Sequence, residues 1–84
     1  MTFGEALELL KQGKKVARKG WNGKNMFLFA VKPLLPHPFN HTNETKDLFI
    51  QDSVCMKTAQ DTVVVGWLAS QADMLAEDWQ EVIQ

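Results

Sequence analysis

The sequence feature that most constrains the fold is the dipeptide Asn22-Gly23, which lies between two short apolar segments, residues 15–19 and 26–31. Both residues of such a pair tolerate the positive φ angles that a two-residue hairpin turn needs. Strands joined by so short a turn pair antiparallel. The dipeptide therefore predicts a β-hairpin within an antiparallel sheet, with Trp21 held at the edge of the turn.

Capping boxes predict where two helices begin. Thr2 can accept a hydrogen bond from the Glu5 amide while the Glu5 side chain reaches back, and Ser70 and Asp73 repeat this spacing. The first box predicts a helix over residues 3–12, since apolar side chains recur there at helical spacing until Gly13 provides a left-handed stop. The second box predicts a short helix that continues through residue 76.

The remaining segments predict strands and one long excursion. Residues 47–51, 54–57, 62–65 and 78–83 are expected as strands, with a turn at 58–61 and Trp79 packed inward. Residues 33–46 contain all three prolines and no periodicity, which is typical of an ordered surface loop. The pattern predicts one α+β domain over residues 1–84, with an N-terminal helix, an antiparallel sheet of about five short strands and a short C-terminal helix.

The size of the chain bears on its assembly and location. A chain of 84 residues buries only a small core, and its single cysteine, Cys55, cannot form an internal disulfide. Small domains without such covalent links often depend on a partner copy, so we expect a homo-oligomer. The lone thiol and the lack of a signal-peptide pattern predict a reducing, cytoplasmic setting. No apolar run reaches membrane-spanning length, so we expect no membrane association.

The charge of the chain is unevenly distributed although its net value is −1. Residues 11–32 carry seven basic side chains and no acidic one, whereas five acidic residues and no basic one follow Lys57. Such a division would attract an anionic ligand to the first half, or attract opposite ends of neighbouring copies to each other. A plain solvated basic stretch is an equally good interpretation of the same pattern.

The residues offer little support for catalysis. His37 and His41 lie in the proline-containing segment, where their spacing is a poor metal signal, and no second cysteine joins Cys55. No glycine-rich phosphate loop occurs, and no serine or cysteine lies in a nucleophile motif. The acidic residues at 73, 77 and 78 are more typical of a helix cap and a solvated face than of an acid–base pair. We therefore expect a protein without enzymatic activity, metal or cofactor.

The tryptophans favour a binding function. Trp21 and Trp67 each follow a glycine, where the backbone can approach a ligand closely, and an indole face stacks on a base without reading its edges. Polar groups that could pair with a ligand follow them in the chain: Asn22 after the first, Ser70 and Asp73 after the second. The alternative, that the tryptophans fill a small core, is strongly favoured for Trp79 and about as good for the other two.

Two runs of sequence resemble a known family: TFGEALELLKQGKKVARKGWNGKNM at the start and GWLASQADMLAEDWQEVI at the end. Both are similar to the signature blocks of a family of small phage and prophage proteins that includes the second type of Thoeris anti-defence protein. The resemblance covers residues 2–31 and 54–83. Residues 33–46 match least, and because this segment varies within the family, the identity of the ligand stays open.

The resemblance implies a sponge rather than an enzyme. Members of this family hold intact the cyclic ADP-ribose isomer that a bacterial TIR-domain sensor makes during infection, and some take up cyclic oligonucleotide signals. They are homo-oligomers, typically tetramers, with pockets between protomers. By this resemblance the pocket residues are Trp21, Asn22, Met26, Trp67, Ser70 and Asp73, and the groups expected to face the pyrophosphate are Arg18, Lys19 or Lys24.

Two alternatives from other classes remain. A nucleic-acid-binding module would use the basic residues 11–32 together with the tryptophans, although an isoelectric point near 6.0 and the acidic C-terminal part oppose binding of a long polyanion. A protein-interaction module would use exposed aromatic side chains as anchors in an interface.

Overall fold

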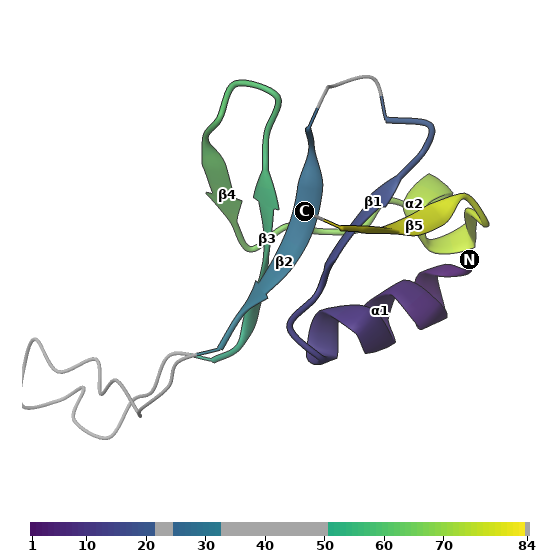
Figure 1. The fold of residues 1–84 in the computed structure, drawn as a ribbon, viewed down its shortest axis with the longest axis horizontal. Helices are drawn as coiled ribbons and strands as arrows, with labels where there is room; N and C mark the ends of the chain where they lie inside the picture. The colour runs from purple at the N-terminus through teal and green to yellow at the C-terminus, as the bar shows by residue number, and fades with distance from the viewer. Residues whose placement is uncertain (22–24, 33–50, 84) are drawn as a thin grey trace, which may run out of the picture.

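A computed structural model describes residues 1–21, 25–32 and 51–83, which form a five-stranded antiparallel sheet with helices beside it (Figure 1). Along the sheet the strand order is β4-β3-β2-β1-β5. The elements in chain order are α1 (Phe3–Lys11), β1 (Lys15–Arg18), β2 (Phe27–Val31), β3 (Ser53–Lys57), β4 (Val63–Val65), α2 (Gln71–Leu75) and β5 (Trp79–Val82). The architecture is the small α+β domain that the sequence predicts.

The helix α1 begins at the predicted capping box. The Glu5 amide donates to the Thr2 hydroxyl at 3.2 Å, and the Thr2 amide donates to the Glu5 carboxylate at 2.8 Å. The helix ends at Lys11, one residue before the predicted end, and Gly13 takes the left-handed conformation with a φ of 85°. Local sequence signals therefore fix both ends of this helix.

The register of the sheet decides which side chains face α1. Val16 pairs with Leu28, and Leu28 pairs with Met56, so these three side chains lie on one face. Val16 and Leu28 are fully buried there against Ala6 and Leu10 of the helix. Figure 1 shows α1 along the β1 and β5 side of the sheet, with β4 at the far edge.

The opposite face carries the alternate residues. Ala17 pairs with Gln80 and Lys15 pairs with Val82, while Phe27 precedes the inward-facing Leu28. Neither described helix packs on this face. The alternation of the strands therefore leaves a surface of mixed apolar and polar side chains, and the candidate site lies on it.

Several predicted segments can be compared directly with the structure. The strands expected at 15–19, 26–31, 54–57, 62–65 and 78–83 are observed, each shifted by no more than two residues at either end. The pairing of β1 with β2 is antiparallel, as a hairpin requires. The Asn22-Gly23 turn, the loop at 33–46 and all but the last residue of the strand expected at 47–51 lie outside the described residues, and Gln51 itself is not in a strand.

Trp79 is the largest fully buried side chain, with 2 % of its surface exposed. Its ring packs against Phe3 at a centroid distance of 5.3 Å and against Trp21 at 5.5 Å, and its indole N–H donates to the backbone carbonyl of Asp73 at 3.0 Å. The prediction that this tryptophan is a core residue is confirmed.

Within the described part of the chain, no helix has the length and apolar character needed to cross a bilayer.

We predict that replacing Trp79 with alanine lowers the free energy of unfolding by about 3–5 kcal/mol, the usual cost of removing a large aromatic ring from a core. The total stability of a small domain is of similar size, so the variant should be largely unfolded at 37 °C. Urea denaturation followed by far-ultraviolet circular dichroism measures the loss. Leu68→Ala is a suitable control because Leu68 is 89 % exposed. A Trp79→Ala variant as stable as that control would contradict the core assignment.

Candidate binding site

A hollow of about 310 Å³ lies on the sheet face away from α1. Its floor comes from three strands: Ala17 from β1, Phe27 from β2, and Gln80 and Val82 from β5. These positions are brought together by the pairing of β1 with both of its neighbours. The floor is apolar apart from the Gln80 amide, which can donate to and accept from a ligand.

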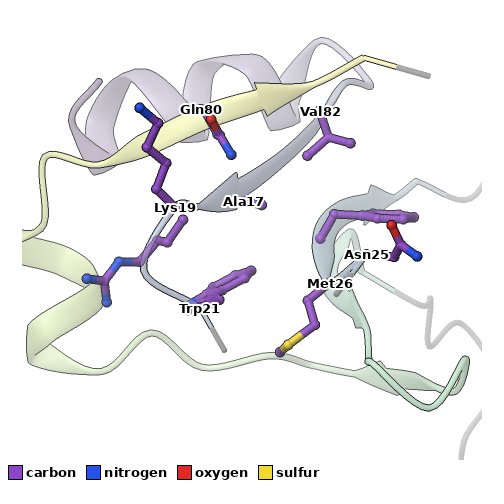
Figure 2. Close-up of a pocket in the computed structure, with 9 residues that line it drawn as sticks. Ala17, Lys19, Trp21, Asn25, Met26, Gln80 and Val82 are labelled. Carbon is purple, nitrogen blue, oxygen red and sulfur yellow. The ribbon is translucent and has the colours of Figure 1, made fainter. Parts of the chain in front are cut away.

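The walls of the hollow supply an aromatic face, a thioether and a cation. Figure 2 shows Trp21 and Met26 along one side and Gln80 and Val82 along the other, with Lys19 near the Gln80 end. Trp21 and Met26 are partly buried, whereas Lys19 is exposed. Such a combination can hold a flat, weakly polar group against the indole while an ammonium faces an anion.

Trp21 is held from behind by two other tryptophans. Its ring meets Trp79 edge-on at 5.5 Å and Trp67 at 6.3 Å, and those two rings are 6.3 Å apart. The Trp21 amide also donates to the Arg18 carbonyl at 3.3 Å. The two interpretations of Trp21, core residue and ligand surface, are therefore compatible, because one part of the indole packs inward while another lines the hollow.

An ion-pair clasp fixes the chain segment that leads to Trp21. The Arg18 guanidinium donates through Nε to Asp78 and through Nη1 to Asp73, each at 2.9 Å. Asp78 accepts a further hydrogen bond from the Gly20 amide at 2.9 Å, and its own carbonyl accepts from the Lys19 amide at 3.1 Å. The clasp joins β1 to α2 and β5, so the charge of Arg18 is already balanced by two carboxylates.

The pKa values of the clasp follow from these contacts. Burial of the Asp73 carboxyl raises its pKa, but hydrogen bonds from Arg18 and from the amide and hydroxyl of Ser70 outweigh burial, so the pKa is lowered overall. For Asp78 the hydrogen bond from Arg18 is the main cause of a lowered pKa, opposed by desolvation and assisted by the Gly20 amide. The two carboxylates correspondingly raise the pKa of Arg18.

Ser70 and Asp73 cap the short helix α2. The Asp73 amide donates to the Ser70 hydroxyl and the Ser70 amide donates to the Asp73 carboxylate, both at 3.1 Å. The capping box predicted from sequence is thus present, and the helix ends at Leu75, one residue earlier than expected. Asp73 serves three contacts at once: the cap, the clasp and, through its carbonyl, the indole of Trp79.

The predicted site residues fall into three groups in the structure. Arg18, Trp21 and Met26 line the hollow, Trp67 lies in the tryptophan cluster, and Ser70 and Asp73 form the cap and clasp. Asn22 and Lys24, like His37 and His41, lie outside the described residues.

Sequence reasoning missed the hollow's floor. Gln80 and Val82 are ordinary strand residues when read alone, and only their register against β1 places them beside Trp21. The signal that could have found them is the alternation of β5 once its pairing with β1 is known. Asn25 was also missed, and it lines the hollow with a positive φ of 60°.

We predict that the clasp makes the protein sensitive to acid. Because both aspartates have lowered pKa values in the fold, their stabilising contribution is fully present above about pH 4, the range of an unfolded aspartate. It is lost as the pH falls through the folded pKa values. Asp78→Asn should therefore melt at a lower temperature than the wild type at pH 7. Between pH 5 and pH 2 its melting temperature should fall by less than that of the wild type.

Thermal melts across that pH range test the clasp, with the exposed Asp52→Asn as control. The control should follow the wild-type curve. Parallel curves for Asp78→Asn and the wild type would contradict a role of the clasp in acid sensitivity.

Comparison with known proteins identifies the family. The family model described as Tad2-like, Thoeris anti-defense 2-like domain, matches residues 1–82. The Thoeris anti-defense 2 protein of Bacillus phage SP01 is 45% identical over 85 residues, which cover 98% of this chain and 94% of that protein. Both matches extend over nearly the whole sequence, so the chain belongs to the Thoeris anti-defense 2-like family.

Proposed function

We propose that the protein binds and sequesters a cyclic ADP-ribose isomer, the immune signal of the Thoeris system, in the cytoplasm of the infected cell and does not degrade it. Membership of the family supports a phage role in Thoeris anti-defence. The observation that supports this ligand is that Trp21 and Lys19 both line one hollow. A cyclic ADP-ribose isomer presents an adenine ring and a pyrophosphate, which these two groups match.

Stacking of the adenine on Trp21 supplies the aromatic part of the interaction. The indole is a partly buried, well-packed surface, so little conformational entropy is lost when a ligand rests on it. The Met26 thioether is polarisable and adapts to the edge of an aromatic ring. Gln80 also lines the hollow, and in this proposal its amide pairs with a base or ribose edge.

The positive charge for the pyrophosphate comes from Lys19 in this proposal. Arg18 also lines the hollow, but Asp73 and Asp78 already accept from it, and moving it to a phosphate would leave those carboxylates without their partner. Lys19 is exposed and forms no ion pair with a described residue. Its ammonium is therefore available for a charge-assisted hydrogen bond to a phosphate oxygen.

Sequestration requires affinity and no chemistry. The described lining of the hollow contains no carboxylate, imidazole, hydroxyl or thiol that could act as nucleophile or general base.

The volume of the hollow, about 310 Å³, is at the lower end of the range for ligand sites, about 300–1,000 Å³. The proposal therefore includes a homo-oligomer, a tetramer by the family resemblance, in which a second copy completes the enclosure. Trp67, which is absent from this lining, would contribute to such a shared site.

The proposal predicts that the signal is recovered intact. The purified protein is mixed with the product of a Thoeris TIR enzyme, incubated for hours and then heat-denatured, and the released nucleotide is identified by mass spectrometry. We expect the unchanged cyclic ADP-ribose isomer in a fixed ratio to protein. A linear or hydrolysed product in excess over protein would contradict sequestration, and no captured nucleotide at all would contradict the proposed ligand.

A second prediction concerns Trp21. Trp21→Ala should weaken binding of the same isomer by about 1–3 kcal/mol, the value of one base–aromatic stack, in calorimetric titration. Trp21→Phe is the matched control, since it keeps an aromatic face and should lose less affinity. The alanine variant should also melt below the wild type because Trp21 packs against Trp79. Wild-type affinity in a folded Trp21→Ala variant would exclude the indole from the site.

A further inference from the structure

The edge strand β4 is unusually apolar for a solvent-facing edge. It consists of Val63, Val64 and Val65, whose exposed fractions are 54 %, 47 % and 73 %. Val64 shares a face with the inward-pointing Met56, but α1 packs against β1, β2 and β5 and leaves Val64 half-exposed. Both faces of the strand are therefore apolar and open to solvent in the described part of the chain.

The backbone of β4 offers hydrogen-bonding groups along its outer side. In the β3–β4 hairpin the Thr58 amide donates to the Thr62 carbonyl and the Gly66 amide donates to the Val54 carbonyl. Because bonded pairs alternate along an antiparallel ladder, Thr62, Val64 and Gly66 direct their amides and carbonyls towards β3. The amides and carbonyls of Val63 and Val65 consequently point away from the sheet. No described strand pairs with this side.

The other edge of the sheet is partly covered. The Trp79 amide of β5 donates to the Met1 carbonyl at 3.1 Å, and the Met1 amino group donates back to the Trp79 carbonyl at 2.8 Å. Natural sheets usually protect an edge with lysine, proline, a bulge or a covering segment. Among the described elements β5 has such a cover, whereas β4 carries neither lysine nor proline.

We infer that β4 pairs antiparallel with β4 of a second copy of this chain, about a two-fold axis that passes beside Val64. In this arrangement Val64 lies opposite the partner's Val64, and Val63 lies opposite the partner's Val65. The outward amides and carbonyls of Val63 and Val65 then pair with those of the partner, and the two sheets become continuous.

The partner strand is inferred to come from a second copy because β4 is complementary to itself. About the two-fold axis every valine meets a valine, so apolar surface is buried on both faces and no charge opposes a like charge. The nearest carboxylate, Asp61, is paired with Lys57 at 2.7 Å and falls opposite the partner's Trp67. The amides of Gly66 and Trp67 both donate to the Val54 carbonyl, a bulge that ends the regular ladder after Val65.

The shortness of the strand sets the strength of the contact. Three residues from each copy bury less surface than a typical stable interface, so the pairing should depend on protein concentration. In an assembly larger than a dimer, the β4 pairing would be one kind of contact between copies, and a second, different interface would join the dimers. The inference concerns assembly alone and does not require the proposed ligand.

Charge reversal across the axis tests the inference. Val64→Lys and Val64→Glu each place like charges opposite one another, so each should reduce the molar mass, measured by light scattering over micromolar to submillimolar concentrations, to half that of the wild type or less. An equimolar mixture of the two variants should regain the wild-type mass, because lysine then lies opposite glutamate. Ile83→Lys is the matched control, since Ile83 is an exposed apolar residue outside β4, and it should keep the wild-type mass.

The outcomes separate assembly from ligand binding. If both Val64 variants keep the wild-type mass, or the mixture does not regain it, the β4 pairing is wrong. A wild-type mass of 9.5 kDa throughout would overturn both the pairing and the oligomer. If a Val64 variant fails to fold, Val65→Pro removes one outward amide and keeps the β3 ladder, and it should reduce the mass in the same way. Titration of the cyclic ADP-ribose isomer in parallel reports on the proposed function independently.

Discussion

The burial of Trp79 is the interaction on which the other parts of this small domain depend. Its indole touches Phe3 of the first helix, Trp21 from the end of β1 and Trp67 from the segment after β4. Its N–H satisfies the Asp73 carbonyl, and its backbone pairs with Met1. One residue therefore joins the N-terminal residue, α1, the segments that follow β1 and β4, and α2, which explains how so few buried residues can hold the domain together.

The sequence predicted the local structure well because local signals determine it. Capping boxes at Thr2 and Ser70 fix the helix starts, and the apolar segments between turns correspond to the strands. The Arg18 clasp could not be predicted in this way. Its partners, Asp73 and Asp78, are distant in sequence, and only the pairing of β1 with β5 brings them to the guanidinium. The same long-range pairing creates the floor of the hollow, so the site was predicted only in part.

The clasp also changes how the charge division of the chain is understood. In sequence, residues 11–32 look like one basic stretch, but in the fold its members have separate roles. Arg18 is balanced by two aspartates, Lys11 pairs with Glu8, and the Lys15 ammonium lies 4.8 Å from the centre of the Phe27 ring. Among the described residues, these three basic side chains therefore each have a partner of their own. This arrangement suits a small ligand with one anionic group better than a long polyanion, whose affinity rests on many phosphate contacts.

The double position of Trp21 would couple stability to the proposed binding. Its indole is held by Trp67 and Trp79 on one side and lines the hollow on another, so the rigidity of the tryptophan cluster is also the rigidity of the proposed ligand surface. A ligand that binds only the folded state raises its stability in proportion to occupancy. Conversely, any change that loosens the cluster should lower affinity without touching the ligand, because the indole must then be reordered on binding. In so small a domain the proposed binding surface and the core are parts of one structure, and neither can change independently of the other.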